Sequence, residues 1–159
     1  MCDNLCIGNR PTEFNPRALG HYGELFILDT DSVSFGITPT PVAIAPMQEG
    51  VHKGIVLSGA AGRLIINARG AYEFLMDMSF SLSSGQTVTI AFYVNNVLVD
   101  DSEQELEVQN SNVVVELGGF GFFETSGVSL PAIIETRISA SSATTLSIEH
   151  LTFGVSGIG

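Results

Sequence analysis

The sequence has no tryptophan, a single lysine, Lys53, and two cysteines, Cys2 and Cys6. Because both cysteines lie among the first six residues, no disulfide can cross-link a core built from the rest of the chain. A structural zinc site needs four thiolate or imidazole ligands, and only His21 lies near the two cysteines. We therefore expect neither a disulfide framework nor a metal or other cofactor.

Positive charge is also scarce. Six lysines and arginines stand against 17 aspartates and glutamates, which gives a formal net charge of −11. The five arginines are dispersed rather than clustered: Arg10, Arg17, Arg63, Arg69 and Arg137. Because a nucleic-acid-binding protein needs a basic patch to meet the phosphate backbone, this composition excludes nucleic acid as a direct ligand.

Long apolar runs are missing. No window approaches 18 uninterrupted apolar residues, and no basic stretch followed by an apolar run opens the chain. We therefore expect no membrane span and no signal peptide, and synthesis in a host cytoplasm. Only 14% of the residues are charged and the mean hydropathy is +0.33. Such an apolar surface is typical of subunit interfaces, which favours an oligomer or a component of a larger assembly.

Strict alternation of apolar residues takes the place of helical periodicity. Between Gly70 and Gly85, every second residue is apolar: Tyr72, Phe74, Met76, Met78, Phe80 and Leu82. Side chains alternate between the two faces of a strand, so this pattern predicts one long strand with an apolar face. The turn residues 83–86 follow, and a second alternating run covers 87–94. We interpret the two runs as an antiparallel hairpin at the centre of a sheet.

Short alternating runs and turn residues continue along the chain. They predict eight to ten strands, no helix, and therefore an all-β antiparallel β-sandwich. The segment from Met47 to Gly54 is expected to be a loop, and Asn95-Asn96 a tight turn. The apolar phase slips near Glu149-His150, which predicts a bulge. Residues 1–20 are rich in Asn, Pro and Gly and are expected to form an extended N-terminal arm that precedes a domain over 21–159.

No arrangement of catalytic groups is recognisable. His21, His52 and His150 stand far apart, and no Gly-x-Ser-x-Gly motif or glycine-rich phosphate loop is present. We therefore expect no enzyme. One acidic run is present and comprises Asp100, Asp101, Glu103, Glu105 and Glu107. Glutamates about 7 Å apart along a strand suit a solvated edge strand better than a calcium cage, and ion binding by the two aspartates is left open.

The order of these motifs resembles a known family. The Tyr22-Gly23-Glu24-Leu25 strand, the Thr/Pro connection, the run Gly70, Tyr72 and Phe74, and the segment Tyr93-Val94-Asn95-Asn96 carry the resemblance, together with a final strand around Leu146 to Ile148. Over about Tyr22 to Val155 the chain resembles phage virion proteins that share the jelly roll of the tumour necrosis factor and complement globular-head family.

The resemblance implies a ten-strand jelly roll that assembles as a homotrimer around a threefold axis. Aromatic residues pack near that axis in the family. By analogy, the candidates for the axis or for the core of each subunit are Tyr72, Phe74, Phe120, Phe122 and Phe123.

The function that these observations favour is structural. The chain is expected to be a capsid decoration (cement) protein on the surface of the phage head, with copies of itself and the major capsid protein as partners. The arm would contact the shell, with candidate residues Leu5, Ile7, Arg10, Phe14 and Arg17. The alternative is a head-fibre or tail-fibre tip that binds a receptor. A lectin-like enzyme domain is least favoured, because tryptophan and paired carboxylates are missing.

Overall fold

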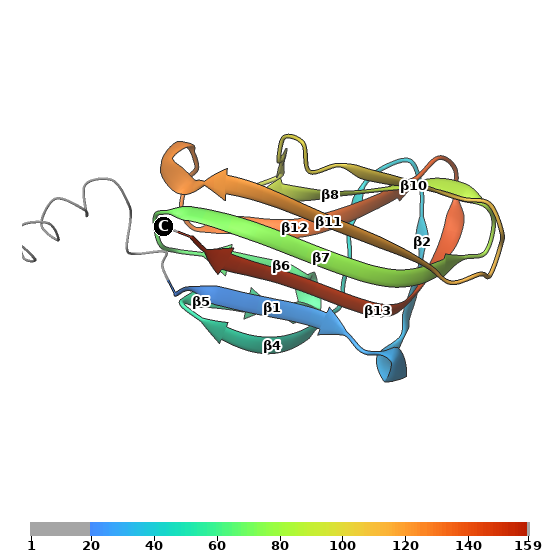
Figure 1. Ribbon diagram of the computed structural model, residues 1–159, viewed down its shortest axis with the longest axis horizontal. Helices are drawn as coiled ribbons and strands as arrows, with labels where there is room; N and C mark the ends of the chain where they lie inside the picture. Colours follow the sequence, from blue (N-terminus) through green and yellow to red (C-terminus); the bar gives the residue numbers. More distant parts are fainter. Residues whose placement is uncertain (1–19, 159) are drawn as a thin grey trace, which may run out of the picture.

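A computed structural model describes residues 20–158 as two antiparallel sheets packed face to face (Figure 1). Sheet A has the order β11-β7-β13-β1-β4, and β2 also pairs with β13. Its strands are β1 (Tyr22–Ile27), β2 (Val33–Ile37), β4 (Gln48–Lys53), β7 (Ala71–Leu82), β11 (Val115–Glu124) and β13 (Thr144–Gly157). The expected all-β sandwich is thereby confirmed.

Sheet B has the order β10-β8-β12-β6-β5, with β3 paired to β12 and β9 paired to β8. Its strands are β3 (Val42–Ala43), β5 (Ile55–Ser58), β6 (Arg63–Ile66), β8 (Gln86–Val94), β9 (Val97–Leu98), β10 (Gln104–Val108) and β12 (Ala132–Ala140). Within residues 20–158, three single turns of 3₁₀-helix connect strands: η2 (Asp29–Asp31), η3 (Gly59–Ala61) and η4 (Thr125–Gly127).

The core lies between the sheets and follows from the alternation in the sequence. All six alternate apolar residues of β7 are buried, and none is more than 3% exposed. An aromatic cluster joins the layers, because the ring of Phe74 in sheet A lies 5.0 Å from that of Phe92 in sheet B. Phe92 in turn stacks on Phe153 of sheet A at 5.8 Å. Such ring contacts add to the free energy gained from burying the apolar area itself.

The prediction that residues 70–94 form a hairpin within one sheet is wrong. β7 pairs with β11 and β13, whereas β8 pairs with β10, β12 and β9, so the two runs lie in opposite sheets. Residues 83–85 cross between the layers, and Thr145 and Thr144 of sheet A hold them through Ser83 and Ser84. Two strands that each have one apolar face bury both faces against one another better in two layers than side by side in one sheet.

Other local predictions have mixed outcomes. The register of β13 against β7 shifts between Ile148 and His150, which confirms the predicted bulge. Asn95 and Asn96 take positive φ values of 50° and 68° in the β8–β9 turn, which confirms the tight turn. The prediction of a loop over 47–54 is wrong, because β4 lies within this segment and pairs with β1. Its residues are mostly exposed and lack alternation, so the local pattern gave no sign of an edge strand.

The first and the last described residues lie at the same end of the sandwich (Figure 1). The amide of Gly157 donates to the carbonyl oxygen of His21 at 2.8 Å, which holds the start of β1 beside the end of β13. No helix within residues 20–158 is long and apolar enough to cross a bilayer. Residues 1–20 of the predicted arm fall outside the described part except for Gly20.

The aromatic cluster between the sheets should dominate stability. Replacing Phe74, which is fully buried, by Ala should lower the free energy of unfolding by about 3–5 kcal/mol, because the cavity removes ring contacts from both sheets. Val56→Ala, on an exposed position of β5, should change it by less than about 0.5 kcal/mol. Urea denaturation followed by tyrosine fluorescence measures both values, and equal losses would contradict the assignment of the core.

Candidate interaction surface

The outer face of sheet A, which points away from sheet B, is unusually apolar. Phe120, Phe122 and Leu75 lie there with 58%, 57% and 60% of their surface exposed. Tyr22 on β1 and Val51 on β4 are also exposed on this face, and they line a hollow together with Leu75. All the exposed phenylalanines and tyrosines among residues 20–158 belong to this face. Exposed apolar area of this kind is typical of interaction sites.

The glycine- and phenylalanine-rich strand β11 creates part of this face. Gly119, Gly121 and Phe123 face the core, whereas Phe120 and Phe122 alternate with them and face outward. A side chain at Gly121 would meet the rings of Phe74 and Phe92 at 3.3 Å, so a glycine leaves room for the aromatic cluster. The strand therefore places small residues inside and large apolar residues outside, which is the reverse of an ordinary surface strand.

A shallow hollow of about 320 Å³ lies on the same face, over β13 and β1. Its centre is Gly154, which pairs with Leu75 on one side and Glu24 on the other. An added Cβ at Gly154 would meet only the carbonyl oxygen of Gly23, at 3.8 Å, so the space above this glycine is open. The remaining lining residues are Tyr22, Val51, Glu73, Thr152, Val155 and Ser156.

Among the described residues, the outer face of sheet B carries no exposed aromatic ring, and it combines the exposed Val56 with charged side chains. β10 is its edge strand, and Glu103, Glu105 and Glu107 beside or within it are exposed, which confirms the charged edge strand expected from the sequence. The cross-strand neighbours of Glu105 and Glu107 are the threonines Thr89 and Thr87. The two outer faces of the sandwich are thus chemically different, and the apolar one is the candidate for contact with another protein.

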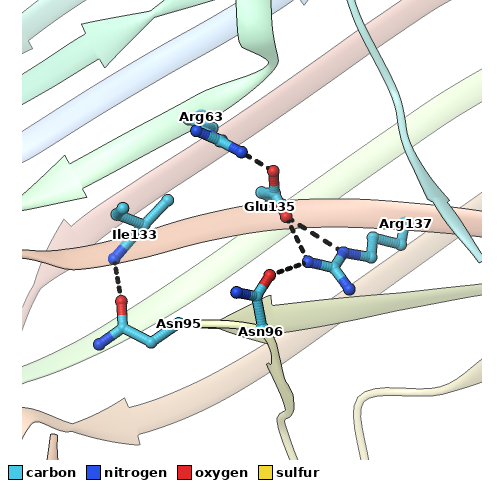
Figure 2. A network of polar contacts seen from close by, with 6 residues as sticks. All are labelled: Arg63, Asn95, Asn96, Ile133, Glu135 and Arg137. Carbon is cyan, nitrogen blue, oxygen red and sulfur yellow. Dashed lines mark hydrogen bonds and ion pairs between the residues drawn. The ribbon is translucent and has the colours of Figure 1, made fainter.

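One polar network joins three segments of sheet B (Figure 2). Arg63 on β6 donates to Glu135 on β12 at 2.8 Å, and Arg137 donates to the other oxygen of the same carboxylate at 2.7 Å. Arg137 also donates to Asn96 Oδ1 in the β8–β9 turn at 2.5 Å and stacks over the ring of Tyr93 at 4.3 Å. The arrangement satisfies a carboxylate that is only 7% exposed, so its first role is to hold strands together.

The surroundings of Glu135 act on its titration in opposite directions. Burial raises the pKa of its carboxyl, but the hydrogen bonds and charges of Arg63 and Arg137 outweigh burial and hold the pKa below its usual value. Glu135 therefore stays ionised at neutral pH. The carboxylate and the two guanidinium groups together carry one net positive charge.

The candidate aromatic residues separate into two groups. Tyr72 and Phe74 are fully buried, and the Tyr72 hydroxyl donates to the carbonyl oxygen of Ala68 at 2.8 Å. Phe123 is half-buried and packs on both rings, at 5.6 Å and 5.1 Å. Phe120 and Phe122 form an edge-to-face pair at 6.1 Å on the outside. The candidate shell-contact residues lie outside the described part of the chain: Leu5, Ile7, Arg10, Phe14 and Arg17.

The titratable residues considered from the sequence do not converge. His52 is exposed on β4, and His150 on β13 lies 3.8 Å from the exposed Asp29. The ring of His21 packs over Gly54, and its Nδ1 is buried without a hydrogen-bond partner among the described residues. No group of three or more His, Cys, Asp or Glu side chains in residues 20–158 is placed to hold a metal ion.

Sequence reasoning missed Tyr22, Val51 and Leu75 as members of the outer face. Leu75 did leave a signal, because it interrupts the polar alternate positions of the long strand. Val51 left none, because it falls in the segment expected to be a loop. The strand order that brings β4, β1 and β7 onto one face depends on long-range pairing, which local alternation does not encode.

A scan of the chain against protein-family models finds no match, and a search of curated proteins finds none either. Solved structures do match, and they define the class: the fold is the jelly roll of tumour necrosis factor and complement globular heads.

Three of the matching structures each align with most of this chain. The Eiger tumour necrosis factor of S. frugiperda has a TM-score of 0.56 at 11% identity, over 87% of this chain and 92% of its own. The globular domain of zebrafish complement 1qA protein has a TM-score of 0.52 at 10% identity, over 87% of this chain and 98% of its own. The vertex protein P5 of phage PRD1 has a TM-score of 0.52 at 11% identity, over 89% of this chain and 99% of its own.

The Glu135 network should make stability depend on pH. Because the folded-state pKa of Glu135 lies below the unfolded value, its stabilisation is present above the unfolded pKa and is lost as pH falls through the folded pKa. Glu135→Gln should therefore cost roughly 1–3 kcal/mol at pH 7, and this cost should shrink as pH falls through the folded-state pKa. Urea denaturation at pH 7 and at a series of acidic pH values measures the change. A cost that does not shrink with falling pH would contradict the ionic role, and Glu105→Gln on the exposed strand β10 is the control.

Proposed function

We propose that the protein is a structural component of a virus particle, a decoration (cement) protein that trimerises and stabilises a phage head. The observation that carries this proposal is the apolar outer face of sheet A. Exposed apolar area of this kind is typical of interaction sites, and here it occurs on a fold shared with a phage vertex protein. The partners proposed are copies of this chain and the major capsid protein.

Self-association is the simplest use of the outer face of sheet A. Exposed phenylalanine, tyrosine and leucine side chains gain free energy on burial, at roughly 25 cal/mol per Å² of apolar surface. The chain has a net charge of −11, so copies repel one another at long range and associate only where apolar contact outweighs that repulsion. The resemblance to the tumour necrosis factor family, which led us to expect a trimer, agrees with this use of the face.

A structural role fits the chemistry of the described residues. The titratable side chains serve strand edges and a strand-joining network rather than a shared cleft, and none of the three similar structures is named for an enzyme. In this proposal residues 1–20 act as an arm that contacts the shell, through Leu5, Ile7, Arg10, Phe14 and Arg17. Two arginines in this arm suit an acidic or carbonyl-rich surface on the capsid protein.

A second candidate function is a vertex-attached head fibre or a tail-fibre tip that binds a receptor. The similarity to a vertex protein favours it, because such a protein sits at particular positions of a particle rather than over the whole shell. Counting copies per particle separates the two functions. A decoration protein occurs in about as many copies as its shell sites, whereas a vertex or tail component occurs in few. Binding to host cells is expected only of the receptor-binding candidate.

The first test of the proposal is the oligomeric state. The wild-type chain should be a trimer by multi-angle light scattering, and Leu75→Lys, which places a charge in the middle of the apolar face, should yield monomers. Val56→Lys, at a similarly exposed position on sheet B, is the matched control and should leave the trimer intact. A wild-type monomer would remove the assembly argument.

The second test concerns the shell. Adding the purified chain to capsids that lack it should raise the temperature at which the capsids disrupt, and electron microscopy should show added density on the shell. Deletion of residues 1–19 should abolish this binding and leave the trimer assembled. Binding that survives the deletion would reject the arm as the contact, and unchanged shells with the full-length chain would reject the decoration role.

A further inference from the structure

We propose that a cavity at one end of the sandwich, between residues 94–100 and the η4 loop, binds a small organic cation of the alkylamine or arylalkylamine class. The apolar part of the ligand enters the cavity, and its ammonium group pairs with Asp100. The cavity lies within one chain, so this inference does not depend on the proposed self-association. It assigns a ligand class to a part of the sandwich that the proposed function leaves unused.

The end cavity has the size and lining of a small-molecule site. Its volume is about 470 Å³, and sites for small molecules typically measure about 300–1,000 Å³. Its walls come from the end of β8, from β9 and the turn after it, from the end of β11, and from η4 and the residues that follow. Most of the lining is apolar and includes Leu98, Val99, Phe122, Phe123 and Val128. Such a lining favours a ligand with an apolar body.

Hydrogen bonds fix both walls of the end cavity. The amide of Ser102 donates to the carbonyl oxygen of Val99 at 3.2 Å, and the buried hydroxyl of Ser102 donates to the same oxygen at 2.7 Å. These two bonds close the turn that carries Asp100. Asn95 joins the two walls, because its Nδ2 donates to the carbonyl oxygen of Ser129 at 3.0 Å. A site that is already formed loses less free energy in ordering its own groups when a ligand binds.

A single carboxylate decides the charge of the ligand. Among the described residues that line the end cavity, Asp100 alone is charged. Its side chain forms no ion pair within residues 20–158. Arg69 lies near η4, but it donates to the carbonyl oxygens of Thr125 and Val128 and does not line the cavity. An unpaired carboxylate beside an apolar cavity attracts a cation and repels an anion.

Phe122 adds a second feature that suits an ammonium group. Its ring is 57% exposed, and it lines the same cavity as Asp100. The faces of aromatic rings attract cations in addition to the attraction of a carboxylate. The net charge of −11 raises the concentration of cations close to the chain. The carboxylate, the exposed ring and the apolar walls together are complementary to an amine that carries an apolar chain.

The first experiment compares three compounds that share a phenyl ring and a short chain but differ in charge: 2-phenylethylamine, 2-phenylethanol and 3-phenylpropionate. Each is titrated into the isotope-labelled full-length chain, and the amide chemical shifts are followed by NMR. The amine should bind with a dissociation constant of roughly 1 mM or tighter, about 10-fold or more below that of the carboxylate, with the alcohol in between. The largest shifts should occur at residues 97–100 and 127–129.

The second experiment removes the charge and keeps the shape. In Asp100→Asn, the affinity for 2-phenylethylamine should fall by roughly 10-fold, to that of 2-phenylethanol, because only the ion pair is lost. The affinity for the alcohol should not change. Glu105→Gln, at an exposed position of β10, is the control and should bind the amine as the wild-type chain does.

The third experiment fills the end cavity from within its own chain. A Cβ at Gly127 would meet nothing within 4 Å, so Gly127→Phe adds a ring without displacing the backbone, and all three compounds should lose binding. Gly36→Phe, at a glycine of β2 with equally open surroundings, is the control and should keep the preference for the amine. Circular dichroism and thermal melting check that each variant is folded.

The outcomes decide this inference separately from the proposed function. Equal affinity for the amine and the carboxylate, no localised shift with the amine, or an Asp100→Asn variant with the wild-type preference would each overturn it. Shifts spread evenly over the surface would also overturn it, because the compounds would then bind by charge alone. Binding of the amine at the end cavity that depends on Asp100 would support it in a monomer or a trimer, whereas a monomer would overturn only the proposed self-association.

Discussion

The packing of two apolar sheet faces against each other is the interaction on which the rest of this structure depends. Each sheet has two faces, and the partner sheet covers only one of them. Phe74, Phe92 and Phe153 join the layers through ring contacts. Sheet A carries the exposed side chains of Phe120, Phe122 and Leu75 on its outer face, whereas sheet B carries the exposed glutamates of β10 and the exposed Val56. The fold of residues 20–158 therefore leaves exposed apolar area on the outside of sheet A, and exposed apolar area of this kind is typical of interaction sites.

Strand β11 links the core to that exposed face. Its inward glycines make room for the rings of Phe74 and Phe92, so the strand contributes little bulk to the core. Its outward phenylalanines contribute to the surface instead. A substitution that enlarged Gly121 would press on the aromatic cluster, and through the backbone of β11 it would also displace Phe120 and Phe122. The interior packing of one subunit and the proposed contact between subunits are thus mechanically coupled.

The few cations of the described residues are mostly used within the chain. Arg63 and Arg137 share Glu135, and Arg69 donates to the carbonyl oxygens of Thr125 and Val128 in the loop before β12. The net charge of the whole chain is −11. This charge makes copies of the chain repel one another at long range, and salt weakens the repulsion by screening it.

The sequence by itself determined most of the strands, the class of fold and the inward set of the long strand, because side-chain alternation is a local property with a period of two residues. It also showed the bulge in β13, since a slip of phase within one strand is visible without any partner. Only the tertiary structure decided that β7 and β8 lie in opposite sheets, that residues 48–53 form a strand, and which of five aromatic residues face outward. Those outcomes depend on pairing between segments far apart in the chain, and local alternation carries no record of which partner a strand will find.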